Sequence, residues 1–263
     1  MAFVTVNGLN FHTQVLKTES DRARPAVVMV HGLTANLAAY YCTIANGLAQ
    51  VADVYLYDQR GHGLTEMPTS GYGESDYVAD LRGLLDSWGL DEPIHLVSNS
   101  FGGITALAFA RDYPTHVASL VLIESLLSTE GLGDHLAREL AAWLQTGNAV
   151  PGYKRDGVAV HRKLARQKRQ WGRLIRKTSL LSDISNLTPF ATADLKAISC
   201  PALAIYGSST PVIDHIRILE RYVAKFDLHV IEGAGHSIMV DRSSEVEELI
   251  RDRLADQSTL VKS

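Results

Sequence analysis

The sequence predicts an α/β fold with a mostly parallel, doubly wound sheet and an antiparallel hairpin at its N-terminal edge. Continuous apolar runs are typical of strands that are buried on both faces, as in parallel sheets. Six such runs occur, at residues 26–30, 54–57, 94–97, 117–123, 202–206 and 228–231. Segments with helical spacing of apolar residues lie between several of them. Alternation of strands and helices predicts a doubly wound sheet, whose chemistry lies at the carboxyl ends of the strands.

The hairpin is predicted from the first sixteen residues. Apolar and polar residues alternate on both sides of Asn7-Gly8. Asn-Gly between two alternating segments is the strongest short signal for a β-hairpin, because both residues tolerate a positive φ. We therefore expect two antiparallel strands before the first parallel strand.

Helices are expected where apolar residues recur every three or four positions. These segments are 77–88, 104–113, 214–222 and 246–254. Residues 126–197 interrupt the alternation, because they show helical patterns, many charges and no strand signal. This segment is predicted to be a helical cap inserted into a core formed by residues 1–125 and 198–263.

Composition narrows the class of protein. The 263 residues carry a net charge of −4 with 46% hydrophobic residues, which favours an ordinary globular protein over a nucleic-acid binder. Neither a signal peptide nor an apolar run of about 20 residues is visible, so a cytoplasmic protein without a membrane segment is expected. The two cysteines form no ligand pattern, and no metal or cofactor is expected. The oligomeric state is not predictable.

Ser100 is the candidate nucleophile. It lies in Ser98-Asn99-Ser100-Phe101-Gly102-Gly103, between a predicted strand and a predicted helix. A serine at a tight strand-to-helix turn needs small neighbours, because the backbone is strained and closely packed there. Ser98 meets this need less fully than a glycine would. A serine that merely caps the helix is the structural alternative.

His236 is the candidate general base. It follows the last predicted strand in Gly233-Ala234-Gly235-His236, at the same sheet edge as Ser100. His31-Gly32 ends the first parallel strand, so the amide of Leu33 could join that of Phe101 as an oxyanion hole. His31 itself is expected to bond loop backbone.

Together these segments resemble the α/β-hydrolase superfamily, and the stretch around Ser100 is similar to that of capped esterases, thioesterases and carbon–carbon bond hydrolases. The resemblance covers about residues 1–125 and 198–263, with the cap as the variable part. It implies a serine hydrolase that works through an acyl-enzyme, with Ser100 and His236 in the catalytic roles.

The acid departs from the family pattern. The resemblance places it three residues after Gly207, at Thr210, which has no carboxylate. Some members, including haloalkane dehalogenases, keep the acid at the end of the preceding strand, which here is Glu124. We favour Glu124. Asp214 is the alternative acid, and a site without a working acid stays open.

The cap suggests the substrate only in outline. Trp143 and Trp171 in the cap, and Met239 after the histidine loop, could line an apolar pocket or simply pack. Residues 154–177 carry ten Lys and Arg residues against one acid, Asp156. This basic segment could be a solvated helix face or could receive an anionic partner, such as a CoA-linked, carrier-protein-linked or carboxylated substrate.

The sequence therefore predicts hydrolysis of a carboxylic ester or thioester, with carbon–carbon bond hydrolysis as a near variant. A non-hydrolytic enzyme with the same Ser/His pocket, such as a lyase, a cyclase or a carbon–carbon bond-forming enzyme, is the main alternative, because Thr210 lacks a carboxylate. A catalytically inactive binding protein is a third hypothesis.

Overall fold

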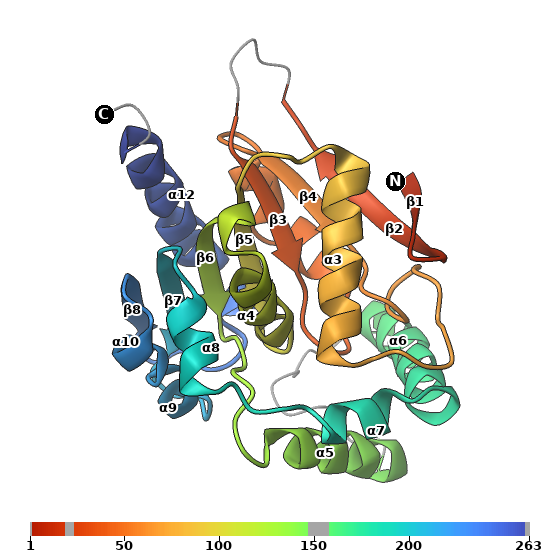
Figure 1. The fold of residues 1–263 in the computed structure, drawn as a ribbon. Helices are drawn as coiled ribbons and strands as arrows, with labels where there is room; N and C mark the ends of the chain where they lie inside the picture. The colour runs from red at the N-terminus through yellow and green to blue at the C-terminus, as the bar shows by residue number, and fades with distance from the viewer. Residues whose placement is uncertain (1, 19–23, 147–157, 261–263) are drawn as a thin grey trace.

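The chain forms one eight-stranded mixed sheet with helices on both faces (Figure 1). The computed structural model describes residues 2–18, 24–146 and 158–260. The strand order is β1-β2-β4-β3-β5-β6-β7-β8. The strands are β1 (Ala2–Val6), β2 (Leu9–Leu16), β3 (Ala26–Val30), β4 (Asp53–Tyr57), β5 (Ile94–Asn99), β6 (Val117–Ile123), β7 (Ala202–Gly207) and β8 (Phe226–Ile231). The predicted fold class is confirmed.

The N-terminal hairpin is formed by β1 and β2, which pair antiparallel, and β2 continues antiparallel onto β4. Asn7 and Gly8 have φ values of 51° and 78°. Two consecutive positive φ angles give the tight turn whose twist matches the flanking strands. All remaining neighbours in the sheet pair parallel.

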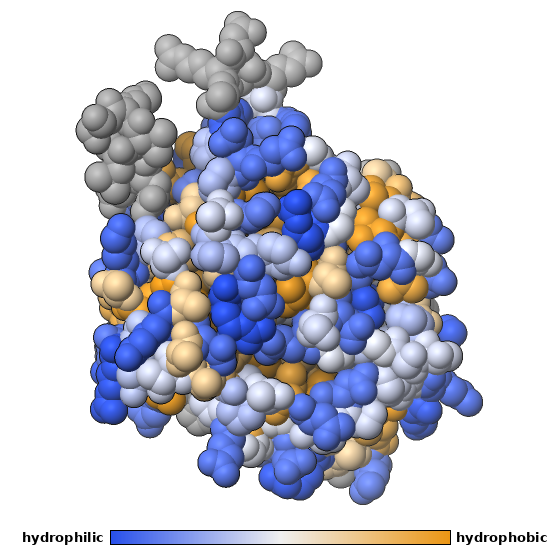
Figure 2. All heavy atoms as spheres, in the orientation of Figure 1, coloured by the Kyte–Doolittle hydropathy of each residue, from blue (hydrophilic) through white to orange (hydrophobic). Residues whose placement is uncertain are grey.

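Two core clusters lie on opposite faces of the sheet. One packs α3 (Glu74–Trp88) and α4 (Gly102–Asp112) against the sheet, with α8 (Thr192–Ala197) and α10 (Leu219–Tyr222) alongside. The short helix η1 (Pro114–His116) follows α4. The other contains residues of α1 (Ala38–Tyr41), α2 (Ala45–Leu48), α11 (Ile238–Asp241) and α12 (Ser243–Leu260). Figure 2 shows that mainly hydrophilic side chains cover the face bearing α3 and α4.

The insertion between β6 and β7 is helical, as predicted. It contains α5 (Leu132–Thr146), α6 (Val158–Lys177), α7 (Leu180–Ser185) and α8. Helices α5, α6 and α7 lie together at one end of the sheet (Figure 1). Residues 147–157 of the predicted cap lie outside the described residues, and the exact cap boundaries stay a prediction. No helix in the described ranges is long and apolar enough to cross a membrane.

The helix predicted over 214–222 is wrong as a single element. The chain forms α9 (Ile213–Ile216) and α10 (Leu219–Tyr222), with a turn between them. The amide of Arg221 bonds the carbonyl of Ile218, only three residues back. Ile216 and Leu219 are both fully buried. The apolar spacing therefore correctly indicated which side chains are buried, but these side chains lie on two short helices instead of one continuous helix.

Candidate active site

Ser100 lies at the turn between β5 and α4, in a left-handed backbone conformation with a φ of 52°. This conformation strains a non-glycine residue and persists only where the surrounding structure enforces it. A Cβ at Gly102 would lie 2.4 Å from the carbonyl oxygen of Val30, and one at Gly32 would lie 3.0 Å from the Ser100 Cβ. The glycines therefore let β3 approach the turn closely.

Ser98 is accommodated two residues before the turn. Its side chain is fully buried, and its hydroxyl lies 3.0 Å from the hydroxyl of Ser125. The mutual hydrogen bond compensates for the burial of both polar groups. A serine thus replaces the glycine that the resemblance leads one to expect, and the turn is kept.

His236 reaches Ser100 from the loop after β8. Its Nε2 lies 3.2 Å from the Ser100 Oγ, and its side chain is 38% exposed. The loop lies so close to β7 that a Cβ at Gly207 would be 2.3 Å from the carbonyl oxygen of Ala234, and only glycine fits there. The amide of Ser209 also donates to that carbonyl.

Glu124 completes the chain of contacts. It follows β6 with a φ of 49°, and its Oε2 lies 2.9 Å from Nδ1 of His236. The side chain is fully buried, so its hydrogen bonds must replace those to water. With Nδ1 facing a carboxylate, the proton lies on Nδ1 and Nε2 is free to accept the proton of Ser100.

Two further donors hold the Glu124 carboxylate. The amide of Gly207 donates to Oε1 at 2.6 Å, and the hydroxyl of Thr210 donates to Oε2 at 2.5 Å. Thr210 was expected only as the position of a missing acid. Its position three residues after Gly207 was the one available signal that it faces Glu124.

Asp214, the alternative acid, lies elsewhere. It is exposed in the first turn of α9. In the described part of the chain, no hydrogen bond or ion pair joins it to His236, whose Nδ1 is bonded to Glu124. The geometry therefore brings together Ser100, His236 and Glu124 and leaves Asp214 apart.

The amides of Leu33 and Phe101 lie on the loops after β3 and β5. Within the ranges described, neither amide donates a hydrogen bond to a protein group. A free pair of amides beside a nucleophile is what an oxyanion hole requires. Their role as oxyanion donors stays a prediction.

A buried network supports the loop that carries Leu33. His31 Nδ1 lies 2.8 Å from the carbonyl oxygen of Gly32, while Nε2 accepts a bond from the amide of Gln59 at 2.9 Å. Burial lowers the pKa of His31, which fits this neutral, bonded ring. The buried carboxylate of Asp58 accepts bonds from the amide of Leu37 and from His12 Nδ1.

The two tryptophans lie in the cap, Trp143 on α5 and Trp171 on α6. Trp143 is buried in the cluster that contains Phe101, and Trp171 packs against that cluster, with its ring centroid 5.5 Å from that of Trp143. Met239 packs in the core cluster that contains α12 residues, apart from the tryptophans. The tryptophans therefore pack in the same apolar cluster as Phe101, next to Ser100, whereas Met239 belongs to the other cluster.

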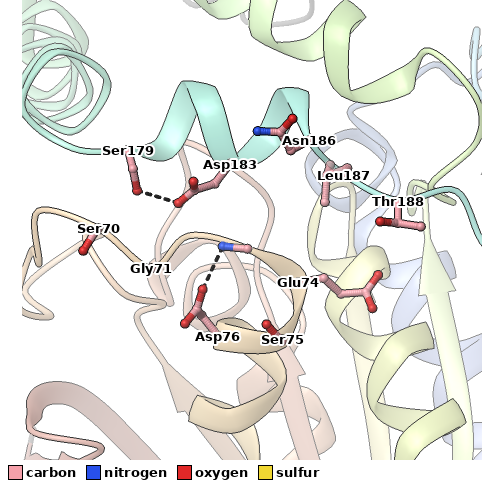
Figure 3. A pocket seen from close by; sticks show the side chains of 11 residues that line it. Ser70, Gly71, Glu74, Ser75, Asp76, Ser179, Asp183, Asn186, Leu187 and Thr188 are labelled. Atoms are coloured by element: carbon pink, nitrogen blue, oxygen red, sulfur yellow. Dashed lines mark hydrogen bonds between the residues drawn. The ribbon is translucent and has the colours of Figure 1, made fainter.

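Among the described residues, hydrogen bonds from both α6 and α7 fasten the cap to the core. The side chain of Asp183 on α7 accepts bonds from the amide of Tyr72 and from the hydroxyl of Ser179. Gln170 on α6 donates to the carbonyl of Gly63. A cavity of about 530 Å³ lies between α7 and residues 70–76, which lead into the first turn of α3, with Asp183 on its wall (Figure 3). Ser100, His236 and Glu124 are not among the residues that line this cavity.

The comparisons with known proteins agree with this fold. The family described as alpha/beta hydrolase fold matches residues 25–187. The chain belongs to this family. It is a hydrolase enzyme of this fold. Within the described residues, no group of three or more His, Cys, Asp or Glu side chains could hold a metal ion.

Relatives of this hydrolase differ in what they act on. It is 28% identical over 249 residues to a 2-hydroxy-6-oxo-2,4-heptadienoate hydrolase of Pseudomonas putida, covering 87% of this chain and 88% of the relative. It is 26% identical to a proline iminopeptidase of Lactobacillus delbrueckii subsp. bulgaricus, covering 94% of each chain. The enol-lactonase structure from Burkholderia xenovorans has a TM-score of 0.76 at 18% identity, covering 97% of this chain and all of that one.

Proposed function

We propose that this hydrolase cleaves a carboxylic ester or thioester through an acyl-enzyme on Ser100. The observation that carries the proposal is the unbroken contact chain from Ser100 Oγ to His236 Nε2 at 3.2 Å and from His236 Nδ1 to Glu124 at 2.9 Å. This is the order of nucleophile, base and orienting acid that acyl transfer needs.

In the proposed reaction, Ser100 Oγ attacks the acyl carbon while its proton passes to His236 Nε2. The amides of Leu33 and Phe101 stabilise the oxyanion of the tetrahedral intermediate. His236 then gives the proton to the leaving alkoxide or thiolate as the carbon–heteroatom bond breaks. Water, deprotonated by His236, attacks the acyl-enzyme. The bond from the acyl carbon to Ser100 Oγ then breaks, His236 returns the proton to Ser100 Oγ and the carboxylic acid is released, while Glu124 keeps the imidazole oriented throughout.

A fluorophosphonate probe tests the proposal without knowledge of the substrate. Ser100 Oγ should form a bond to phosphorus as fluoride leaves, and mass spectrometry should locate the adduct on Ser100. Ser100→Ala should abolish labelling, and Ser98→Ala is the matched control, because Ser98 is buried against Ser125. Labelling of another serine, or none in folded protein, would contradict the proposal.

Carbon–carbon bond hydrolysis is a second candidate. It is favoured by the similarity to the 2-hydroxy-6-oxo-2,4-heptadienoate hydrolase. Turnover of a 2-hydroxy-6-oxo-2,4-dienoate, measured beside that of p-nitrophenyl acetate, distinguishes the two reactions. The non-hydrolytic alternative rested on the missing carboxylate at Thr210, and the contact of Glu124 with His236 removes that reason.

We further propose that the substrate carries an anionic group that α6 attracts, with a CoA or carrier-protein thioester as the expected form. The sequence of α6 places arginines at 4-3 spacing, at positions 162, 166, 169, 173 and 176. The side chains of Arg169, Arg173 and Arg176 are exposed, while those of Leu174 and Ile175 on the same helix are buried. Such an amphipathic helix presents positive charge outward.

Salt dependence tests this part. KM for an acyl-CoA should rise with ionic strength, because exposed charges are screened, whereas KM for the same acyl group on N-acetylcysteamine should stay constant. Arg169→Gln/Arg173→Gln should raise KM only for the CoA ester. If KM stayed constant with ionic strength for both esters, α6 would be a solvated surface without a role in substrate binding.

A further inference from the structure

Thr210 touches the Glu124 carboxylate, and among the described residues it makes no hydrogen bond to Ser100 or to the ring of His236. Its hydroxyl lies 2.5 Å from Glu124 Oε2, the same oxygen that faces His236 Nδ1 at 2.9 Å. Thr210 is 6% exposed, so this contact is largely shielded from water. We propose that Thr210 is a positioning residue, whose hydroxyl holds the Glu124 carboxylate in the orientation that binds His236.

The carboxylate needs such a partner because of where it sits. The backbone of Glu124 has a φ of 49°, and its side chain is fully buried. Gly207 fixes only Oε1. Without the Thr210 hydroxyl, Oε2 would keep only His236 as a partner. The carboxylate could then turn about its last side-chain bond, and His236 would lose its orienting acid. Hydrogen bonds to charged groups are the stronger ones, so this contact can set the orientation.

The loop that carries Thr210 is itself rigidly held. The amide of Ser209 donates to the carbonyl of Ala234, and the amide of Thr210 donates to the carbonyl of Gly207. The hydroxyl of Ser208 accepts a bond from the amide of Gly233. These bonds join the loop to the segment that leads into His236. The hydroxyl is therefore placed by the same backbone that places the base.

Two substitutions separate positioning from packing. Thr210→Val keeps the volume and removes the hydroxyl, whereas Thr210→Ser keeps the hydroxyl and removes a methyl group. The readout is the second-order rate constant for fluorophosphonate labelling of Ser100, followed by intact mass. Positioning predicts a loss of about tenfold or more for Thr210→Val and a loss below threefold for Thr210→Ser.

A packing role predicts the reverse order, because the valine variant fills the same space and the serine variant leaves a gap. That order, or labelling of Thr210→Val at the wild-type rate, would overturn the proposal. Thr192→Val, an exposed threonine in the first turn of α8, is the control for the substitution itself. Thermal melting of each variant shows that the rates belong to folded protein.

The inference rests on the proposed function, and the two can fail separately. If the wild-type protein is not labelled on Ser100, the proposed function fails and the rates carry no information. The His236 Nδ1 proton then tests Thr210 alone, as a low-field NMR signal of a hydrogen bond to Glu124. The signal should persist in Thr210→Ser and shift or vanish in Thr210→Val. An unchanged signal in Thr210→Val would overturn the positioning role.

Discussion

Replacing Glu124 by glutamine should remove almost all turnover while leaving the fold intact. The glutamine side chain has nearly the same shape, but its amide has one oxygen in place of two. Three donors surround the carboxylate: the Gly207 amide at 2.6 Å, the Thr210 hydroxyl at 2.5 Å and His236 Nδ1 at 2.9 Å. A single amide oxygen cannot accept both the Gly207 bond and the His236 bond, because these two donors face different oxygens of the carboxylate.

The magnitude follows from the two orientations of the glutamine. With its oxygen toward His236, its NH₂ group opposes the Gly207 amide and leaves a buried donor unpaired, at a cost of about 1–3 kcal/mol. With its NH₂ toward His236, the imidazole must accept at Nδ1 and carry its proton on Nε2, so it cannot accept the Ser100 proton. The second orientation satisfies Gly207 and should dominate.

The wrong tautomer should lower kcat about 10⁴-fold, or roughly 5 kcal/mol, as the equivalent change does in serine proteases. Hydrolysis of p-nitrophenyl acetate measures the effect, with thermal melting as the check on folding. Asp214→Asn is the matched control and should change kcat less than twofold, because Asp214 is exposed on α9. A loss under tenfold for Glu124→Gln would refute the assignment of the acid.

Three further changes test the scaffold. Gly102→Ala puts a Cβ 2.4 Å from the Val30 carbonyl and should lower the melting temperature by about 3–10 °C in scanning fluorimetry; an unchanged value would contradict the packing argument. Burial lowers the pKa of His95 to about 4, below its ordinary 6.5, so the unfolded state binds the proton first. The free energy of unfolding should therefore fall as pH drops from about 6.5 to about 4, by on the order of 3 kcal/mol, and urea titrations of His95→Gln should show a flatter dependence. Asp183→Ala unpairs the Tyr72 amide, whose hydrogen exchange should speed up about tenfold by mass spectrometry; unchanged exchange would show that this contact does not hold the cap.

The sheet was predictable from the sequence because a strand buried on both faces has few alternatives to a continuous apolar run. The run at 26–30 matches β3 and the run at 117–123 matches β6 residue for residue. The segment 214–222 failed because periodicity reports which side chains are buried, not whether the backbone ladder is continuous. Ile216 and Leu219 are buried from two separate turns.

The site was predictable in part for a related reason. Ser100, His236 and Glu124 each follow a strand, and parallel strands bring such residues to one edge. Beyond the spacing from Gly207, the contact of Thr210 with Glu124 was not predictable, because it depends on the register between neighbouring strands. Ile123 pairs with Ile205, and the Glu124 amide bonds the Ile205 carbonyl, which sets the carboxylate beside the loop after β7.

This register implies that the ends of β6 and β7 share one space for an acid. Thr210 Oγ1 already reaches within 2.5 Å of the oxygen that His236 contacts. Glycine at position 124 would suit the φ of 49° and empty that space, so Glu124→Gly should lose kcat about as severely as the glutamine variant. Adding Thr210→Asp should then regain at least tenfold, because a carboxylate one bond longer than the threonine hydroxyl can meet Nδ1. Thr210→Asn in the same background is the matched control, since it has the shape of aspartate without the charge. If the aspartate and asparagine variants hydrolysed p-nitrophenyl acetate equally slowly while both were folded, the two strand ends would not share the acid site.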